Sequence, residues 1–257
     1  MTLRQKWGVW IVLTIACLLI GILTGLQSTI ATPFLGPVST LFVLIAAVPG
    51  YKELIRITSL KQGLLILFAL SLFAYLIEIV GVQTGFPYSS FVYAQTLQSF
   101  LVAGVPWTTA FGWVPLILSS YFATRIWSTQ RKGVWIIFWS ALLLVTFDLV
   151  LDPGAVRLGL WSYASTGWYH AVPWQNFAGW LLTGTLVLFT LHRALSRTIV
   201  QRTNMFAFLI GPAAILSFWT GIALSASMVL PALIGCLLLL FFTFTWQAES
   251  TKRAPSQ

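Results

Sequence analysis

Long apolar stretches alternate with short polar or Pro/Gly-rich breaks along the whole chain. About 20 apolar residues carry an α-helix across the hydrocarbon core of a bilayer, and each stretch is close to that length. The stretches cover residues 7–30, 34–51, 63–82, 112–128, 133–152, 176–195, 205–225 and 228–247. The pattern predicts an all-α polytopic membrane helix bundle of about eight transmembrane helices, forming a single integral-membrane domain over residues 1–257.

The composition agrees with a membrane protein. Of the 257 residues, 58% are hydrophobic and 7% are charged, whereas soluble domains carry about 25% charged residues. Two histidines and two cysteines are too few for a histidine-rich metal centre, a zinc finger or a disulfide framework. The chain has no G-x-G-x-x-G fingerprint after a strand and no P-loop. We therefore expect neither a cofactor nor a metal.

The basic residues predict the orientation of the bundle. With both termini cytoplasmic, all of the 14 lysines and arginines except Arg157 fall on the inner side, as the positive-inside rule requires. We therefore expect a multi-pass protein of a prokaryotic plasma membrane. The net charge of +9 then reflects topology and attraction to anionic lipid, and no nucleic-acid partner is expected. The first stretch follows Arg4 and Lys6 as in a signal peptide, but its length favours an uncleaved span.

Two predicted outer loops, residues 83–111 and 153–175, are long and rich in aromatic residues, glycine and proline. Ordered loops of this length are usually functional. Residues 91–104 are moderately apolar and could form a short interfacial or re-entrant helix, because the segment is too short to cross the membrane.

The two long loops end in the same pattern. Val-Pro-Trp, four residues and Gly-Trp occupy residues 105–113 and again residues 172–180. Each copy follows an apolar helix with a deep acid, Glu78 or Asp148. The spacing favours a parallel internal repeat, in which the third and fourth helices form one copy and the fifth and sixth helices form the other. Tryptophans that only anchor helices at the membrane interface are the alternative.

Three of the five acidic residues fall within or next to apolar stretches: Glu78, Asp148 and Asp152. Glu53 and Glu249 are expected in an inner loop and in the tail. At about 1.5 Å per residue, Glu78 and Asp148 both lie roughly 22 Å from the inner face. A carboxyl group at that depth costs several kcal/mol unless it is protonated, paired or facing a cavity. These acids are therefore functional candidates.

Asp148 and Asp152 lie on one helical face, provided that the helix persists to Pro153, where we expect it to end. Two adjacent carboxyl groups in a medium of low dielectric favour one neutral and one ionised member. Such a pair can donate one proton and accept another. Arg157 is the candidate counter-ion, and a purely structural Asp–Arg pair that locks the loop is the alternative.

Four sequence blocks carry a family resemblance: E-x-x-G-x-x-T-G-x-P at 78–87, G-V-P at 104–106, D-L-V-L-D-P-x-A-x-x-x-G-x-W at 148–161, and V-P-x-x-N-F-x-G-W at 172–180. Over a core at about residues 75–184, the chain resembles the integral-membrane carotenoid hydratases. The resemblance implies cofactor-free addition of water to the 1,2 double bond of an acyclic carotenoid end group, as in γ-carotene or bisanhydrobacterioruberin. The implied partners are a hydrophobic carotenoid, the lipid bilayer and other enzymes of carotenoid biosynthesis.

Hydration of a trisubstituted alkene needs a proton donor, stabilisation of a tertiary cation and a base that directs water. We expect Asp148 to donate the proton, Asp152 or Glu78 to orient the water, and Asn176 to hold that water. The polyene would enter from the bilayer with its end group in the outer third. Aromatic faces can stabilise the cation, and the candidates are Trp107, Trp161, Trp168, Trp174, Tyr88 and Tyr169.

Three other functions remain open. A lycopene-cyclase-type enzyme would protonate the same end group but close a ring without adding oxygen. A proton- or cation-coupled transporter or lipid-binding protein would use the acids as a binding site, and a transporter would need polar residues continuing toward the inner face. A passive pigment-binding scaffold would leave product chemistry unchanged. The D-x-x-x-D spacing of Asp148 and Asp152 also occurs in membrane prenyltransferases, but the second acidic cluster of those enzymes is missing.

Overall fold

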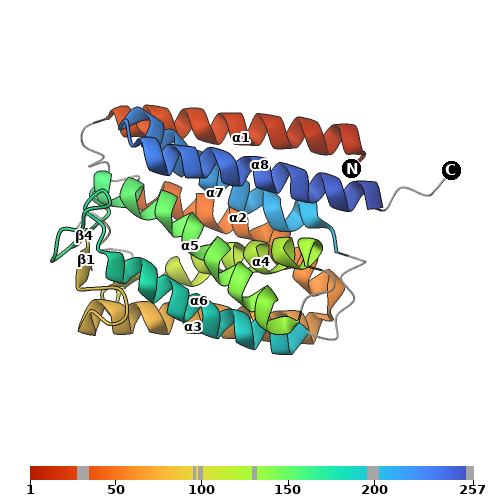
Figure 1. Ribbon diagram of the computed structural model, residues 1–257, viewed down its shortest axis with the longest axis horizontal. Helices are drawn as coiled ribbons and strands as arrows, with labels where there is room; N and C mark the ends of the chain where they lie inside the picture. The colour runs from red at the N-terminus through yellow and green to blue at the C-terminus, as the bar shows by residue number, and fades with distance from the viewer. Residues whose placement is uncertain (28–34, 95–96, 98–100, 129–131, 196–202, 253–257) are drawn as a thin grey trace.

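The computed structural model describes residues 1–27, 35–94, 97, 101–128, 132–195 and 203–252. Within these residues the chain forms a bundle of eight helices that run roughly parallel or antiparallel to one another (Figure 1). Their bounds are α1 (Leu3–Leu26), α2 (Leu35–Ile57), α3 (Leu60–Thr84), α4 (Thr109–Trp127), α5 (Gly133–Arg157), α6 (Trp174–Leu195), α7 (Met205–Ser225) and α8 (Val229–Lys252). The predicted all-α bundle is confirmed.

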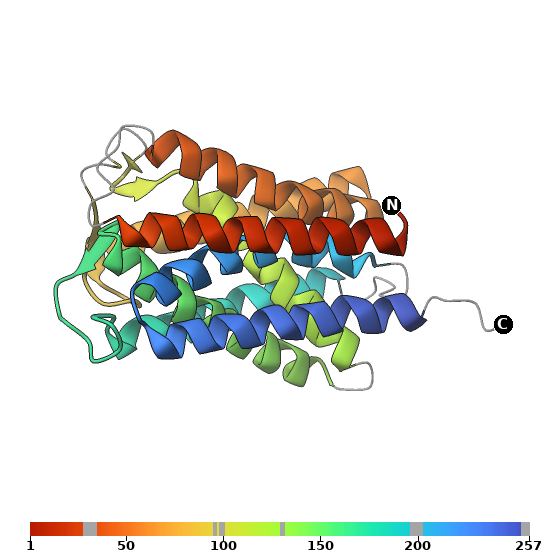
Figure 2. The same cartoon turned by 90° about the horizontal axis from the view of Figure 1, so that it is seen from above.

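Seven of the described helices are long and apolar enough to cross a membrane, and α4 is not among them. Helix α4 has 19 residues, most of its side chains are buried, and its second half carries polar groups such as Ser119, Ser120 and Arg125. The start of α1 and the end of α8 lie at the same end of the bundle (Figures 1 and 2). Four of the basic residues used to predict orientation lie outside the described residues: Arg131, Arg197, Arg202 and Arg253.

Glu53 is not in a loop, contrary to the prediction, because α2 continues to Ile57. The side chain of Glu53 is only 4% exposed. It accepts hydrogen bonds from Arg56 Nε and Nη2 at 2.7 and 2.6 Å and from the backbone N–H of Asn204 at 2.5 Å. Asn204 is the residue before α7, so the carboxylate accepts a hydrogen bond from a backbone N–H at the N-terminus of that helix. Glu249 is likewise a buried residue of α8, not part of an exposed tail.

Glu53→Ala should lower the free energy of unfolding by about 1–3 kcal/mol, because it leaves a backbone donor and Arg56 without their acceptor. Lys52→Ala, an exposed neighbour in the same turn, should change it by less than about 0.5 kcal/mol. Unfolding of the two variants in detergent micelles measures the difference, and equal stabilities would contradict the role given to Glu53.

Helix α5 also extends beyond its predicted end, since it runs through Pro153 to Arg157. Proline has no N–H and leaves the carbonyl four residues earlier without its helical partner. That carbonyl belongs to Leu149, and the hydroxyl of Tyr169 donates to it at 2.9 Å. A side chain from the following loop therefore supplies the missing hydrogen bond, and the helix continues.

Tyr169→Phe should cost about 1 kcal/mol of stability because it removes this hydrogen bond. In a Pro153→Ala background the restored N–H can bond to Leu149, so the same change should cost less. A double-mutant cycle measured by thermal unfolding tests the coupling. Equal losses in the two backgrounds would show that Tyr169 stabilises α5 by another route.

The two long loops meet at one end of the bundle (Figure 1). Strand β1 (Phe91–Tyr93) of the first loop pairs antiparallel with β4 (Trp161–Tyr163) of the second. Strands β2 (Leu101–Val102) and β3 (Val105–Pro106) form a small hairpin. In the described part of residues 91–104, strands therefore replace the predicted short helix, and they bring the two loops together over the ends of α3 and α5.

Candidate active site

The three acids converge beneath the paired loops. Asp148, Asp152 and Glu78 are 1%, 3% and 7% exposed. The side-chain amide of Asn176 donates to Asp148 Oδ2 at 2.7 Å and to Asp152 Oδ2 at 2.6 Å. Asn176 lies in the first turn of α6, so this amide joins α6 to both acids of α5. Asn176, which is expected from the sequence to hold the reacting water, therefore lies against both aspartates.

Two tyrosines of the paired strands hydrogen-bond the acids. Tyr163 of β4 donates to Asp152 Oδ2 at 2.5 Å. Tyr93 of β1 donates to Glu78 Oε2 at 3.3 Å, and Trp113 Nε1 donates to Glu78 Oε1 at 3.2 Å. Burial and the nearby carboxyl groups raise the pKa of Tyr93 and that of Tyr163 well above the usual range. Both phenols therefore stay neutral and remain donors at physiological pH.

The acids differ in their hydrogen bonds and in their access to open space. Asp152 Oδ2 accepts two short hydrogen bonds, whereas those to Glu78 are longer. Asp148 Oδ1 is buried and has no hydrogen-bond partner among the described residues. Glu78, Asp152 and Asn176 line a cavity of about 630 Å³, and Asp148 is not among its lining residues. Asp148 thus lies behind the amide that it shares with Asp152.

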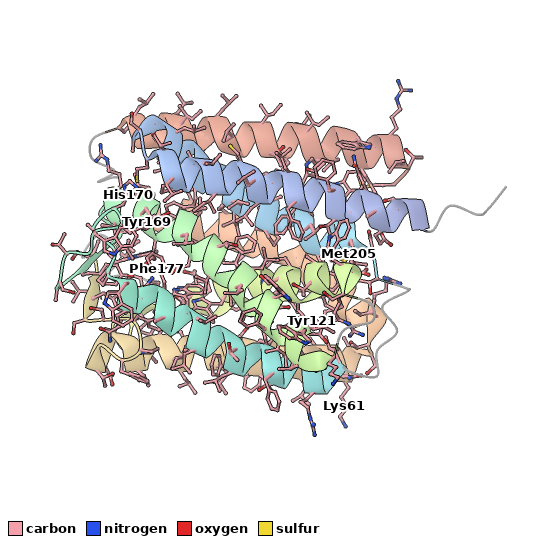
Figure 3. All side chains as sticks on the ribbon, in the orientation of Figure 1. Lys61, Tyr121, Tyr169, His170, Phe177 and Met205 are labelled. Carbon is pink, nitrogen blue, oxygen red and sulfur yellow. The ribbon has the colours of Figure 1, made fainter. Side chains whose placement is uncertain are left out.

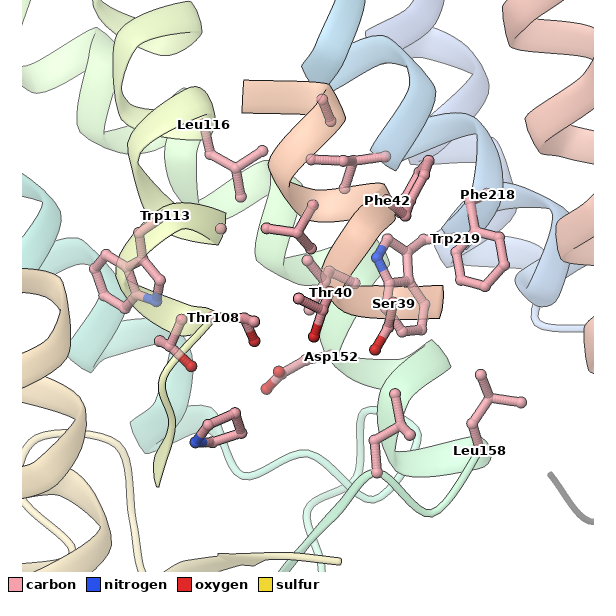
Figure 4. Close-up of a pocket in the computed structure, with 18 of the residues that line it drawn as sticks. Ser39, Thr40, Phe42, Thr108, Trp113, Leu116, Asp152, Leu158, Phe218 and Trp219 are labelled. Atoms are coloured by element: carbon pink, nitrogen blue, oxygen red, sulfur yellow. The ribbon is translucent and has the colours of Figure 1, made fainter. Parts of the chain in front are cut away.

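The cavity brings polar groups and apolar walls together. Figure 4 shows Asp152 beside Thr108 and Trp113 on one side and Ser39 and Thr40 of α2 on the other. Its remaining walls come mainly from apolar side chains of α1, α2, α4 and α7. Such a cavity suits a largely apolar ligand with one end directed toward the carboxyl groups.

Tyr88 occupies a slot made by two glycines. A Cβ atom at Gly81 would lie 2.8 Å from Tyr88 Cδ2, and one at Gly179 would lie 2.7 Å from Tyr88 Cδ1. The hydroxyl of Tyr88 donates to Thr183 Oγ1 at 3.2 Å. The two glycines of the sequence blocks therefore allow the Tyr88 ring to pack between α3 and α6.

The tryptophans that close the two repeated patterns are in direct contact. Trp113 of α4 and Trp180 of α6 stack with ring centroids 4.1 Å apart and planes 14° apart. Both also line the cavity. The stack places two aromatic faces close to Glu78, whose carboxyl group accepts a hydrogen bond from Trp113.

The predicted aromatic set is only partly in place. Tyr88 and Trp161 line the cavity, whereas Trp168 and Trp174 are 84% and 69% exposed. Tyr169 is buried and bonded to Leu149, and Figure 3 shows it beside Phe177 at the end of the bundle opposite Lys61. Trp107, the fourth tryptophan of the predicted set, is 36% exposed and packs edge-on against Phe111. It does not line the cavity.

Arg157 does not reach the acids. It is an exposed residue in the last turn of α5, and among the described residues no salt bridge joins it to an acid. The buried acids are instead held by neutral donors. This arrangement allows a carboxyl group to exchange a proton without breaking an ion pair.

Tyr93, Tyr163, Trp113 and Trp180 are site residues that the sequence prediction missed. A signal for the tyrosines exists, because Tyr93 follows Glu78 by the same 15 residues that separate Tyr163 from Asp148. The stacked tryptophans belong to the repeated Gly-Trp pattern that was recognised without a role at the site.

Comparison with known proteins gives this site a context. The chain is 37% identical to bisanhydrobacterioruberin hydratase of Haloarcula japonica over 144 residues. The matched residues make up 55% of this chain and 49% of the hydratase. The chain thus spans about half the length of that relative. No solved structure matches the chain. Residues 35–242, which include every acid of the site, match the model of the carotenoid biosynthesis proteins, and the chain belongs to that family.

Proposed function

We propose that the protein hydrates the 1,2 double bond of an acyclic carotenoid end group and yields a tertiary alcohol. The main support for this proposal is that the carboxyl groups of Glu78 and Asp152 line the same, mainly apolar cavity. The identity to a carotenoid hydratase over about half the chain and the membership of a carotenoid biosynthesis family support this reading.

We assign the proton donor to Glu78 and the base to Asp152. Short hydrogen bonds from Tyr163 and Asn176 favour the ionised form of Asp152, whereas Glu78 accepts only longer bonds and is more easily neutral. Asp148, the donor expected from the sequence, does not line the cavity. It instead positions Asn176, which in turn orients Asp152.

The reaction then proceeds in two proton transfers. The O–H bond of the Glu78 carboxylic acid breaks as a C–H bond forms at the less substituted alkene carbon, and the tertiary carbon becomes cationic. Water adds its oxygen to that carbon while Asp152 accepts the proton that the water loses. Return of this proton to Glu78 restores the starting state, so one water is consumed and no net proton. The faces of Trp113, Trp180 and Trp161 are available to stabilise the cation.

The placement of the protein in its membrane belongs to the same proposal. If the chain crosses the membrane eight times with both termini in the cytoplasm, the N-terminus and the C-terminus lie at the same end of the bundle. The start of α1 and the end of α8 have these positions in Figure 1. The paired loops and the acids then lie at the outer side of a prokaryotic plasma membrane, within a single domain.

We also propose that α3–α4 and α5–α6 are parallel repeats. Val92 pairs with Ser162 at the centre of the strand pair, and each lies 14 residues beyond its acid, Glu78 or Asp148. On either side of this central pair, Phe91 pairs with Tyr163 and Tyr93 pairs with Trp161. A two-fold rotation about the central pair therefore places each of these flanking pairs on the other. The stacking of Trp113 on Trp180 supports the same axis.

Expression of the chain in a host that accumulates an acyclic carotenoid tests the function. Extracted pigments should gain the mass of one water for each modified end group, and an empty vector should give no gain. A pigment of unchanged mass with a new ring would favour a cyclase, and an unchanged pigment would contradict any enzymatic role on that substrate.

A further inference from the structure

The cavity extends well beyond the acids. Along α2 its wall runs from Val38 to Pro49, and along α1 it runs from Leu13 to Thr24, about 16 Å in each case at 1.5 Å per residue. The acids lie near one end of this space, since Glu78 is in the second-last turn of α3. The space is therefore elongated along the helices, as an extended hydrocarbon chain requires.

One wall of the cavity reaches the surface of the bundle. Its exposed lining residues include Ile20 of α1 at 54%, and Val38 and Ile45 of α2 at 63% and 61%. All three belong to helices long and apolar enough to span a membrane, so their outer faces meet lipid. The cavity therefore opens sideways between α1 and α2.

Close contacts with α7 hold the two helices in place beside the opening. A Cβ atom at Gly21 of α1 would collide with the backbone of Phe218 on α7. A Cβ atom at Gly211 of α7 would collide with the backbone of Ala46 on α2. Both helices are thus anchored on α7, which forms the floor of the cavity with Ala214 and Phe218.

We propose that this cavity is a polyene-binding tunnel with a lateral portal between α1 and α2, rimmed by Ile20 and Ile45. The proposal rests on the proposed function and names the route to its site. The end group of the polyene lies at Glu78 and Asp152, the adjoining chain lies along α2 and α7, and the remainder passes through the portal into lipid. The site therefore encloses one end of the ligand and leaves the other end free.

Tryptophan substitutions at matched positions test the portal. Ile20→Trp and Ile45→Trp place a large side chain at the rim. Ile15→Trp and Leu41→Trp place the same side chain on the same helices at residues that are 51% and 59% exposed and do not line the cavity. All four sites are exposed, so insertion and folding should be preserved in each variant.

Two measurements separate binding from chemistry. Affinity for an acyclic carotenoid is measured in the inactive Asp152→Asn background by the change of polyene absorbance on binding, and hydration is measured in the active background. The rim variants should lower the affinity and the hydration rate by about tenfold or more. The reason is that overpacking at a binding site typically costs enough free energy to weaken binding by about that factor. The matched controls should stay within about twofold.

The outcomes distinguish this inference from the proposed function. Loss of polyene binding in the rim variants but not in the controls, together with no hydrated product in the active background, would support the portal and overturn the hydratase function. Unchanged binding and hydration in both rim variants would overturn the portal while the function stands. Absence of polyene binding by the Asp152→Asn protein without any tryptophan substitution would overturn the tunnel itself.

Discussion

Asp152→Asn should lower the rate of carotenoid hydration by about 10²–10⁴-fold, the range typical for loss of a positioned general acid or base. The amide keeps the size of the side chain and can still accept from Tyr163 and Asn176, but it cannot take the proton from the attacking water. Pigment conversion over time in membranes with equal amounts of protein measures the loss.

Asp148→Asn is the matched control for this variant, since it makes the same change one turn away. Asp148 does not line the cavity, so its replacement should reduce the rate less than Asp152→Asn does. A larger loss at Asp148 than at Asp152 would reverse the assigned roles and favour Asp148 as the group that transfers a proton to the substrate.

Glu78→Gln should reduce hydration by a comparable factor of about 10²–10⁴, because the amide has no acidic proton to transfer to the alkene. The acceptor oxygen needed by Trp113 remains, which limits structural change. Measurement in deuterated water separates the two roles. Asp152→Asn should still exchange deuterium into the unhydrated alkene, because Glu78 delivers a deuteron and the cation can lose a proton back to the Glu78 carboxylate. Glu78→Gln should not exchange. Deuterium incorporation by Glu78→Gln would contradict its role as donor.

The helices could be predicted from the sequence because lipid imposes a simple requirement on length and polarity. Their ends were less predictable. The charge of Glu53 predicts a loop, but Glu53 lies within α2, where hydrogen bonds from Arg56 and from the N-terminus of α7 compensate its burial. The missing N–H of Pro153 predicts a helix end, but Tyr169, 16 residues after Pro153, supplies the lost hydrogen bond to Leu149.

The acids of the site were predictable because ionisable groups are rare in membrane spans and must have a partner or a cavity. Which acid faces the cavity was not, since Asp148 and Asp152 share a helical face and only packing separates them. The tyrosine donors depend on pairing between β1 and β4, which no local pattern encodes. Trp168 and Trp174, predicted as substrate contacts, are exposed and do not line the cavity, because aromatic content alone does not fix the direction of a loop side chain.

Incorporation of labelled oxygen tests the central claim most directly. Purified protein in lipid vesicles is given an acyclic carotenoid in water enriched in heavy oxygen, and the pigment is resolved by mass, with Asp152→Asn as the inactive reference. The proposed mechanism predicts one heavy oxygen, from one water, in each hydrated end group formed by the unsubstituted protein. A converted pigment without the heavy oxygen would contradict it.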